Sequence, residues 1–226
     1  MHETFKELLA GNRSHAAAEG SRFDDLQDGQ EPDAVTVCCS DSRVLQDAMW
    51  ENDDPGRLFT VGNMGNRVTQ RTAEGDVVSG DVLYPIAYAG TDVAVVVGHT
   101  GCGAVTATYD ALTNGRDDPP GVTRCIDLLR PRLEPALDQL PQDVSEEDAV
   151  NSLVEYNVDR QVDALIESDD VPDDVTAYGV VYDFQDVYGG DRGEVHVVNV
   201  DGDRHPATIK ENNPELAERV RRQFTY

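Results

Sequence analysis

The chain has 226 residues, of which 44 are acidic and 18 basic, for a formal net charge of -26. It is long enough to bury one sizeable core, and no run of about 18 apolar residues predicts a membrane span. The acidic excess also disfavours binding to nucleic acid or to an anionic membrane, because the phosphates of both need basic contacts.

The order of the predicted elements indicates the fold class. A helix at 3–10 opens an N-terminal arm over residues 1–33, whose remainder is polar and acidic. Apolar runs predict strands at 34–39, 57–61, 92–99, 175–184 and 193–200. Helical patterns follow at 73–90, 102–115, 122–139, 145–167 and 213–224. Strands that alternate with helices predict one α/β domain over 1–226, with a mainly parallel central sheet flanked by helices.

Four cysteines, Cys38, Cys39, Cys102 and Cys125, are too few for a disulfide framework in a chain of this length. The N-terminal stretch is amphipathic and charged, with no apolar signal-peptide region, so we expect a soluble cytoplasmic protein. In that reducing compartment the thiols act as ligands, nucleophiles or core residues. Cys38 and Cys125 are interpreted as packing residues.

Chemically suggestive residues follow two of the strands. Cys39 ends the strand at 34–39 and is followed by Asp41 and Arg43, as C-x-D-x-R. His99 ends the strand at 92–99 and is followed by Cys102, as H-x-x-C. If these strands are neighbours, two thiols and an imidazole meet at one sheet edge, where sites of open α/β sheets gather. Three such ligands suit tetrahedral zinc with a vacant fourth position.

Each element alone has a plainer interpretation. A cysteine at a strand end is usually a small buried hydrophobe, and an Asp-x-Arg pair is usually a surface ion pair. The glycines at 98, 101 and 103 could simply serve a strand-to-helix turn. The conjunction of the two motifs after two strands is what favours a catalytic metal site.

The motifs resemble those of the beta-class carbonic anhydrases. "CSDSR" (39–43) and "GHTGCG" (98–103) resemble the two zinc-site motifs of that family. "GNMGN" (62–66) resembles its Gly/Asn loop, and later segments resemble its following helix and strand, namely "NVDRQVDAL" (157–165) and "YGVVYDFQDV" (178–187). The resemblance therefore extends well beyond a single motif.

The resemblance implies roles for individual residues. Cys39, His99 and Cys102 become the ligands of one zinc ion per chain, and Asp41 and Arg43 become the dyad beside it. The implied reaction is reversible hydration of carbon dioxide to bicarbonate and a proton through zinc-bound hydroxide. Asp41 would orient that nucleophile, and Arg43 would hold Asp41 away from the metal.

Gln30, Phe59, Tyr84 and Gly103 are the substrate-pocket positions that the resemblance implies. Gln30, nine residues before Cys39, and the two aromatics match plant-type members of the family. We therefore predict a resting site open to water rather than a closed form in which an aspartate is the fourth ligand. A surface glutamine and two core aromatics are the plainer alternative.

Family resemblance also implies a homodimer or a dimer of dimers, with each N-terminal arm lying on its partner. Two rival functions stay open, hydrolysis of carbon disulfide or carbonyl sulfide and a non-catalytic protein with structural zinc. The Asp-rich, Lys-poor composition resembles that of proteins from salt-loving microbes. It predicts a fold that needs salt to screen its own repulsion.

Overall fold

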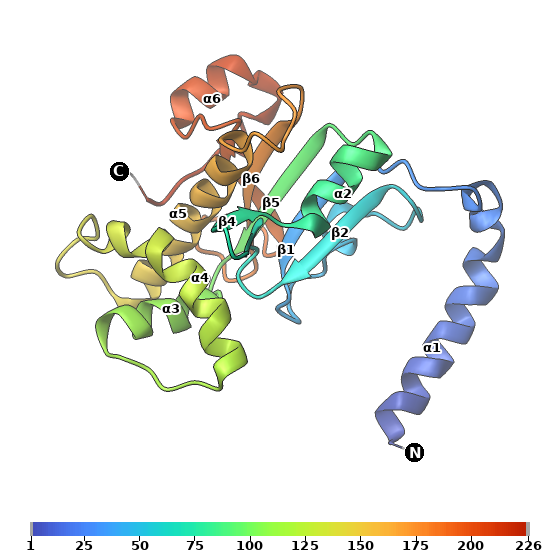
Figure 1. The fold of residues 1–226 in the computed structure, drawn as a ribbon, viewed down its shortest axis with the longest axis horizontal. Helices are drawn as coiled ribbons and strands as arrows, with labels where there is room; N and C mark the ends of the chain where they lie inside the picture. The colour runs from blue at the N-terminus through green and yellow to red at the C-terminus, as the bar shows by residue number, and fades with distance from the viewer. Residues whose placement is uncertain (1, 225–226) are drawn as a thin grey trace.

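The computed structural model describes residues 2–224, and its centre is a five-stranded sheet (Figure 1). The strand order is β2-β1-β5-β6-β7, and all neighbours are parallel except β6 and β7. These strands are β1 (Ala34–Cys39), β2 (Leu58–Asn63), β5 (Val93–His99), β6 (Thr176–Asp183) and β7 (Glu194–Val200). The predicted mainly parallel α/β sheet is confirmed.

Helices flank the sheet as predicted, and their apolar side chains build the core. They are α2 (Gly80–Ala89), α3 (Gly103–Thr113), α4 (Pro120–Leu137), α5 (Glu146–Ile166) and α6 (Pro206–Asn212). On β1, Val35 and Val37 belong to the cluster that contains residues of α4 and α5, whereas Cys38 belongs to a second cluster with Ile209 of α6. Burial on both faces explains why the parallel strands are continuous apolar runs. Within residues 2–224, no helix is long and apolar enough to cross a membrane.

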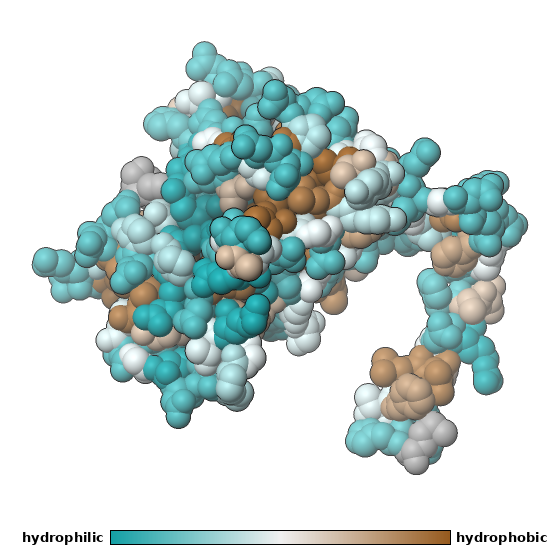
Figure 2. Space-filling model, in the orientation of Figure 1, coloured by the Kyte–Doolittle hydropathy of each residue, from teal (hydrophilic) through white to brown (hydrophobic). Residues whose placement is uncertain are grey.

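The N-terminal helix is longer than predicted. The structure has α1 over Glu3–Glu19, continuing through Gly11 and Asn12, where the sequence predicted its end. The alanines at 16–18 favour the longer helix, since alanine has the highest helix propensity. The helix projects from the body and buries none of its residues (Figure 1). Hydrophobic side chains nevertheless gather on it (Figure 2).

The predicted helix at 73–90 is half wrong. A short hairpin precedes it, formed by β3 (Thr69–Arg71) and β4 (Asp76–Val78), and α2 begins only at Gly80. Gly75 takes a φ of +132° in this turn, a conformation that glycine adopts far more easily than other residues. The glycine therefore belongs to the turn of a hairpin and does not interrupt a helix.

The predicted C-terminal helix at 213–224 is also wrong. Only a 3-10 turn at Pro214–Leu216 forms there, and the unpredicted helix α6 precedes it. Val220 forms a parallel bridge to Val197 beside β7, and the guanidinium of Arg222 is almost fully buried. Tertiary contacts thus hold residues 217–224 in a largely non-helical conformation, although the spacing of their apolar residues alone is typical of a helix.

Candidate metal centre

Two neighbouring strands and the turn before α3 bring three metal-binding side chains together. β1 pairs with β5 in parallel, so Cys39 and His99, which end these strands, lie at the same sheet edge. Cys102 immediately precedes α3. The ligand atoms of the three residues lie within 4.8 Å of one another, and all three residues are buried. The strand ends converge as the sequence predicts.

The His99 ring is turned so that one nitrogen faces the two sulfurs. Its Nδ1 lies 2.9 Å from the carbonyl oxygen of Thr100, which can only accept a hydrogen bond, so Nδ1 carries the proton. Nε2 is therefore the free acceptor, and it is buried without a hydrogen-bond partner. Such an orphaned atom is costly unless it binds something, and a metal ion would satisfy it.

The two thiols share a proton. Cys102 donates a hydrogen bond to Cys39 across 3.9 Å, which lowers the pKa of Cys39 and raises that of Cys102. Backbone N–H groups also stabilise negative charge on both sulfurs, from Gly65 toward Cys39 and from Ala104 and Val105 toward Cys102. A divalent cation that displaces the shared proton would be held by two thiolates.

This donor set fits zinc. Two thiolates and an imidazole are soft to borderline ligands, and three protein ligands leave a fourth tetrahedral position, the pattern of catalytic zinc sites. Asp41 is the carboxylate beside that position, with its Oδ2 atom 3.9 Å from Nε2 of His99. The residues present therefore fit a zinc ion with one exchangeable position.

Asp41 is held by Arg43 rather than pointing freely at the ligands. The guanidinium donates two hydrogen bonds to the carboxylate, 2.9 Å to Oδ1 and 2.7 Å to Oδ2, and the backbone N–H of Arg43 adds a third. These bonds hold the pKa of Asp41 well below its ordinary value. The carboxylate is thus ionised throughout the neutral range.

A side chain that sequence analysis missed links the dyad to the ligands. The centroid of the Phe184 ring lies 4.6 Å from the guanidinium carbon of Arg43. The same ring stacks on the ring of His99, with 5.8 Å between the two centroids. Arg43 also donates to the carbonyl oxygen of Gly101, whose N–H donates to the side chain of Asn151. Phe184 stands in the quoted late strand segment, but an aromatic after an apolar run carries no signal of this contact.

The predicted pocket residues divide into two groups. Gly103 begins α3 directly after Cys102 and so lies at the metal centre. Phe59 and Tyr84 lie together, with ring centroids 6.2 Å apart, but away from the ligands. Asn63 on β2 is the strand partner of Cys39, and Phe59 lies four residues before Asn63 on the same strand. Four residues of a strand span roughly 13 Å.

Gln30 lies still further from the metal centre of its own chain. It precedes β1 and lines a surface pocket with Pro32 and Tyr88 at the opposite end of the strand from Cys39. Within one chain, the structure therefore brings together the ligands, the dyad and Gly103, but not Gln30, Phe59 and Tyr84.

A family model described as "Carbonic anhydrase" matches residues 34–194, which is most of the chain. The chain belongs to the carbonic anhydrase family. A carbonic anhydrase of Pseudomonas aeruginosa is 30% identical over 162 residues, which cover 72% of this chain and 71% of that protein. One from Mycolicibacterium smegmatis is 35% identical over 119 residues, covering 53% of this chain and about half, 54%, of that relative.

Solved structures place this carbonic anhydrase in the beta class. The beta-carbonic anhydrase CafA of Aspergillus fumigatus is 25% identical, with a TM-score of 0.71 over 95% of this chain and 99% of that one. A beta-carbonic anhydrase of Sordaria macrospora, described as tetrameric, matches with a TM-score of 0.73 over 88% of this chain and 98% of that one. At 20% identity the second match shows the shared fold.

Proposed function

We propose that this carbonic anhydrase catalyses the reversible, zinc-dependent hydration of carbon dioxide to bicarbonate and a proton. The observation that carries this proposal is the buried, unpartnered Nε2 of His99 facing two thiols. Cys39, His99 and Cys102 would hold one zinc ion per chain. When bound, zinc lowers the pKa of a water molecule toward about 7 and so supplies a hydroxide nucleophile at ordinary pH.

The dyad would orient the reacting oxygen. Asp41 is ionised and lies beside the fourth position, so its carboxylate can accept a hydrogen bond from the attacking oxygen and direct a lone pair toward carbon dioxide. Arg43 occupies both carboxylate oxygens, which disfavours coordination by Asp41 and keeps that position open. A purely structural metal site has no use for this arrangement.

The test is stopped-flow hydration of carbon dioxide by zinc-loaded protein in molar potassium chloride, scanned across the neutral range. We expect a rate that rises with pH through one titration, and none for Cys39→Ser, which loses a ligand. Cys125→Ser is the matched control, because Cys125 lies on α4 outside the metal cluster. A wild-type protein with one zinc per chain and no rate above buffer would overturn the proposal. Turnover of carbonyl sulfide by that same protein would identify the rival hydrolase.

The working unit that we propose is a homodimer, or a dimer of dimers, in which a second copy supplies Gln30, Phe59 and Tyr84 to each metal centre. Exposed apolar side chains support an interface, since Leu8 on α1 is 65% exposed and Tyr88 on α2 is 80% exposed. The distance between these pocket residues and the ligands of their own chain supports the same arrangement.

Light scattering on the full chain tests the assembly. The double substitution Leu8→Asn with Leu9→Asn removes two of the exposed large apolar side chains of α1, leaving Phe5, and should shift the protein toward monomer. Arg13→Asn, on the same exposed helix, is the control and should leave the mass unchanged. A mass that is monomeric in the wild type, or that the double substitution does not alter, would contradict the arrangement.

We further propose that residues 1–226 act as one domain in a reducing cytoplasm of high salt content. The cysteines are all free thiols in the structure, which suits a reducing compartment. The net charge of -26 suits molar salt, because screening weakens repulsion between surface carboxylates.

A further inference from the structure

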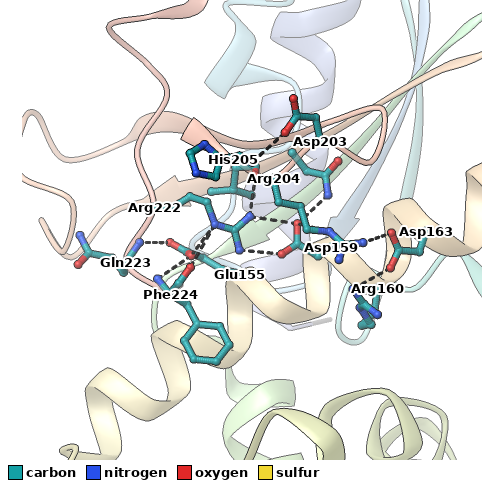
Figure 3. Close-up of polar contacts among 12 residues, drawn as sticks. Glu155, Asp159, Arg160, Asp163, Asp203, Arg204, His205, Arg222, Gln223 and Phe224 are labelled. Carbon is teal, nitrogen blue, oxygen red and sulfur yellow. Dashed lines mark hydrogen bonds and ion pairs between the residues drawn. The ribbon is translucent and has the colours of Figure 1, made fainter. Parts of the chain in front are cut away.

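Helix α5 carries five buried polar side chains: Asn151, which accepts the N–H of Gly101, and two further groups of two. One group faces the C-terminal segment, where Glu155 and Asp159 accept hydrogen bonds from Arg222, Gln223 and Phe224 or form ion pairs with them (Figure 3). The other group consists of Asn157 and Gln161, which are 1% and 0% exposed and are directed elsewhere. Neither amide takes part in the reaction as described so far.

The two amides form a ladder that ends on the loop after β2. The backbone N–H of Val68 donates to Oε1 of Gln161 at 3.0 Å, and Nε2 of Gln161 donates to Oδ1 of Asn157 at 3.1 Å. Nδ2 of Asn157 then donates to the carbonyl oxygen of Gly65 and to Oδ1 of Asn66, both at 3.1 Å. Because the oxygen of each amide accepts a hydrogen bond and its nitrogen donates one, the orientation of both side chains is fixed.

The loop that this ladder holds has an unfavourable backbone and touches a metal ligand. Gly65 and Asn66 have φ angles of +84° and +44°, in the left-handed region. Asn63, at the start of this loop, is the strand partner of Cys39, and the backbone N–H of Gly65 helps to lower the pKa of the Cys39 thiol. Asn63 and Arg67 bond each other across the loop, and the ladder adds a support from outside at the two left-handed residues themselves.

We propose that Asn157, supported by Gln161, is a positioning residue of the metal centre, which aims the Gly65 N–H at the Cys39 sulfur. This inference rests on the proposed zinc site and names a residue group that tunes it. A hydrogen bond to a ligating thiolate withdraws electron density from the sulfur, so it sets how much charge the ligand donates to the metal. Asn157 acts on the metal through one peptide group, without touching it.

Cobalt(II) provides the readout, because its thiolate-to-metal charge-transfer band reports the electron density of the sulfurs. Loss of the Gly65 hydrogen bond makes Cys39 a stronger donor and should move the band to longer wavelength. Zinc affinity, measured by competition with a chelator, should fall by about 10- to 100-fold, as is usual when a partner of a metal ligand is removed. Neither measurement depends on turnover.

The variants are Asn157→Ala, which removes both donors to the loop, and Gln161→Met, which removes the supporting amide at similar length. Asp159→Asn is the matched control: it lies on the same helix, is fully buried and perturbs the network at the C-terminal segment instead (Figure 3). We expect the shifted band and weakened zinc binding in Asn157→Ala, a smaller change in Gln161→Met, and a wild-type spectrum in Asp159→Asn.

Three results would overturn the inference. Asn157→Ala could bind both metals as the wild type does, or Asp159→Asn could show the same shift, which would make general loosening of α5 the cause. If Asn157→Ala fails to fold, Gln161→Met decides, and an unchanged band in that variant is the third result. A wild-type protein without any charge-transfer band would instead defeat the proposed metal site itself.

Discussion

Substituting Gly65 with alanine tests how tightly the metal-site loop is packed. A Cβ atom there would lie 2.7 Å from Cδ1 of Leu129 on α4, closer than real contacts allow. The φ angle of +84° adds about 1–2 kcal/mol for a residue with a side chain, and overpacking a well-filled core adds about 1–3 kcal/mol. We therefore expect Gly65→Ala to lower the free energy of unfolding by about 2–5 kcal/mol.

Denaturant unfolding at fixed high salt measures this loss, and Gly121→Ala is the control. Gly121 lies near the start of α4, the helix that carries Leu129, and a Cβ atom there meets nothing within 4 Å. Because alanine restricts the unfolded chain, Gly121→Ala should be neutral or stabilise by about 0.4–1 kcal/mol. A Gly65→Ala protein as stable as this control would refute the packing argument.

A double-mutant cycle separates the clash from the backbone strain. Leu129→Ala alone should cost about 2–5 kcal/mol by leaving a cavity, but it also removes the atom that the new Cβ meets. In that background Gly65→Ala should cost only the backbone part, about 1–2 kcal/mol. An equal cost of Gly65→Ala in both backgrounds would show that the clash is relieved by other movements.

Three further predictions concern pH, metal and salt. Arg43 depresses the pKa of Asp41, so the pair stabilises the fold above the ordinary carboxyl pKa, about 4, and this stability is lost as pH falls through the folded pKa. Asp41→Asn should therefore lose less unfolding free energy than the wild type between neutral and acid pH. An equally steep loss in both proteins would contradict this. Chelating the metal leaves Nε2 of His99 unsatisfied, so the melting temperature should fall, by the equivalent of about 2.7 kcal/mol if zinc is present at 100 times its dissociation constant. Equal melting temperatures in calorimetry with and without chelator would count against a bound metal. Desalting should reduce the helical signal in circular dichroism, because the net charge of -26 is no longer screened. A spectrum that stays unchanged in dilute buffer would argue against a salt-dependent fold.

The metal centre could be predicted because its chemistry is local in the sequence. Cys39 ends one strand and His99 another, Asp41 and Cys102 follow shortly after, and parallel strands place their carboxyl ends at one edge. The neighbouring position of β1 and β5 was the only spatial condition, and the structure meets it. Soft ligands at two strand ends therefore indicate a zinc site from the sequence alone.

What could not be predicted depends on contacts between distant segments. Arg222 stands in a helical pattern, but its guanidinium lies 2.7 Å from the carboxylate of Asp159, and this pairing needs an extended chain. Asn157 and Gln161 interrupt the apolar face of a predicted helix, which was a usable signal of a buried polar role. The spacing did not show that their partner would be the loop beside Cys39.

The exposed helix α1 was expected to be short because Gly11 and Asn12 are weak helix formers. It continues to Glu19 without packing on the body. Propensity decides such an isolated segment, whereas packing decides buried ones. Sequence patterns therefore predicted too short a helix at the N-terminal end, and a helix at 213–224 that does not form.

The buried carboxylates of α5 have a consequence for the order in which the chain matures during synthesis. Glu155 and Asp159 leave the ribosome more than 60 residues before the segment that neutralises them, as the separation of 63 residues between Asp159 and Arg222 shows. Tyr188, Asn199 and Arg204 contact these carboxylates earlier in the chain. Until Arg222 and the backbone of Phe224 arrive, however, docking α5 on the sheet buries Glu155 without its cationic partner. Closure of the core around α5 is thus complete only once the segment at 222–224 has been made, and a chain truncated before Arg222 should dock this helix less stably.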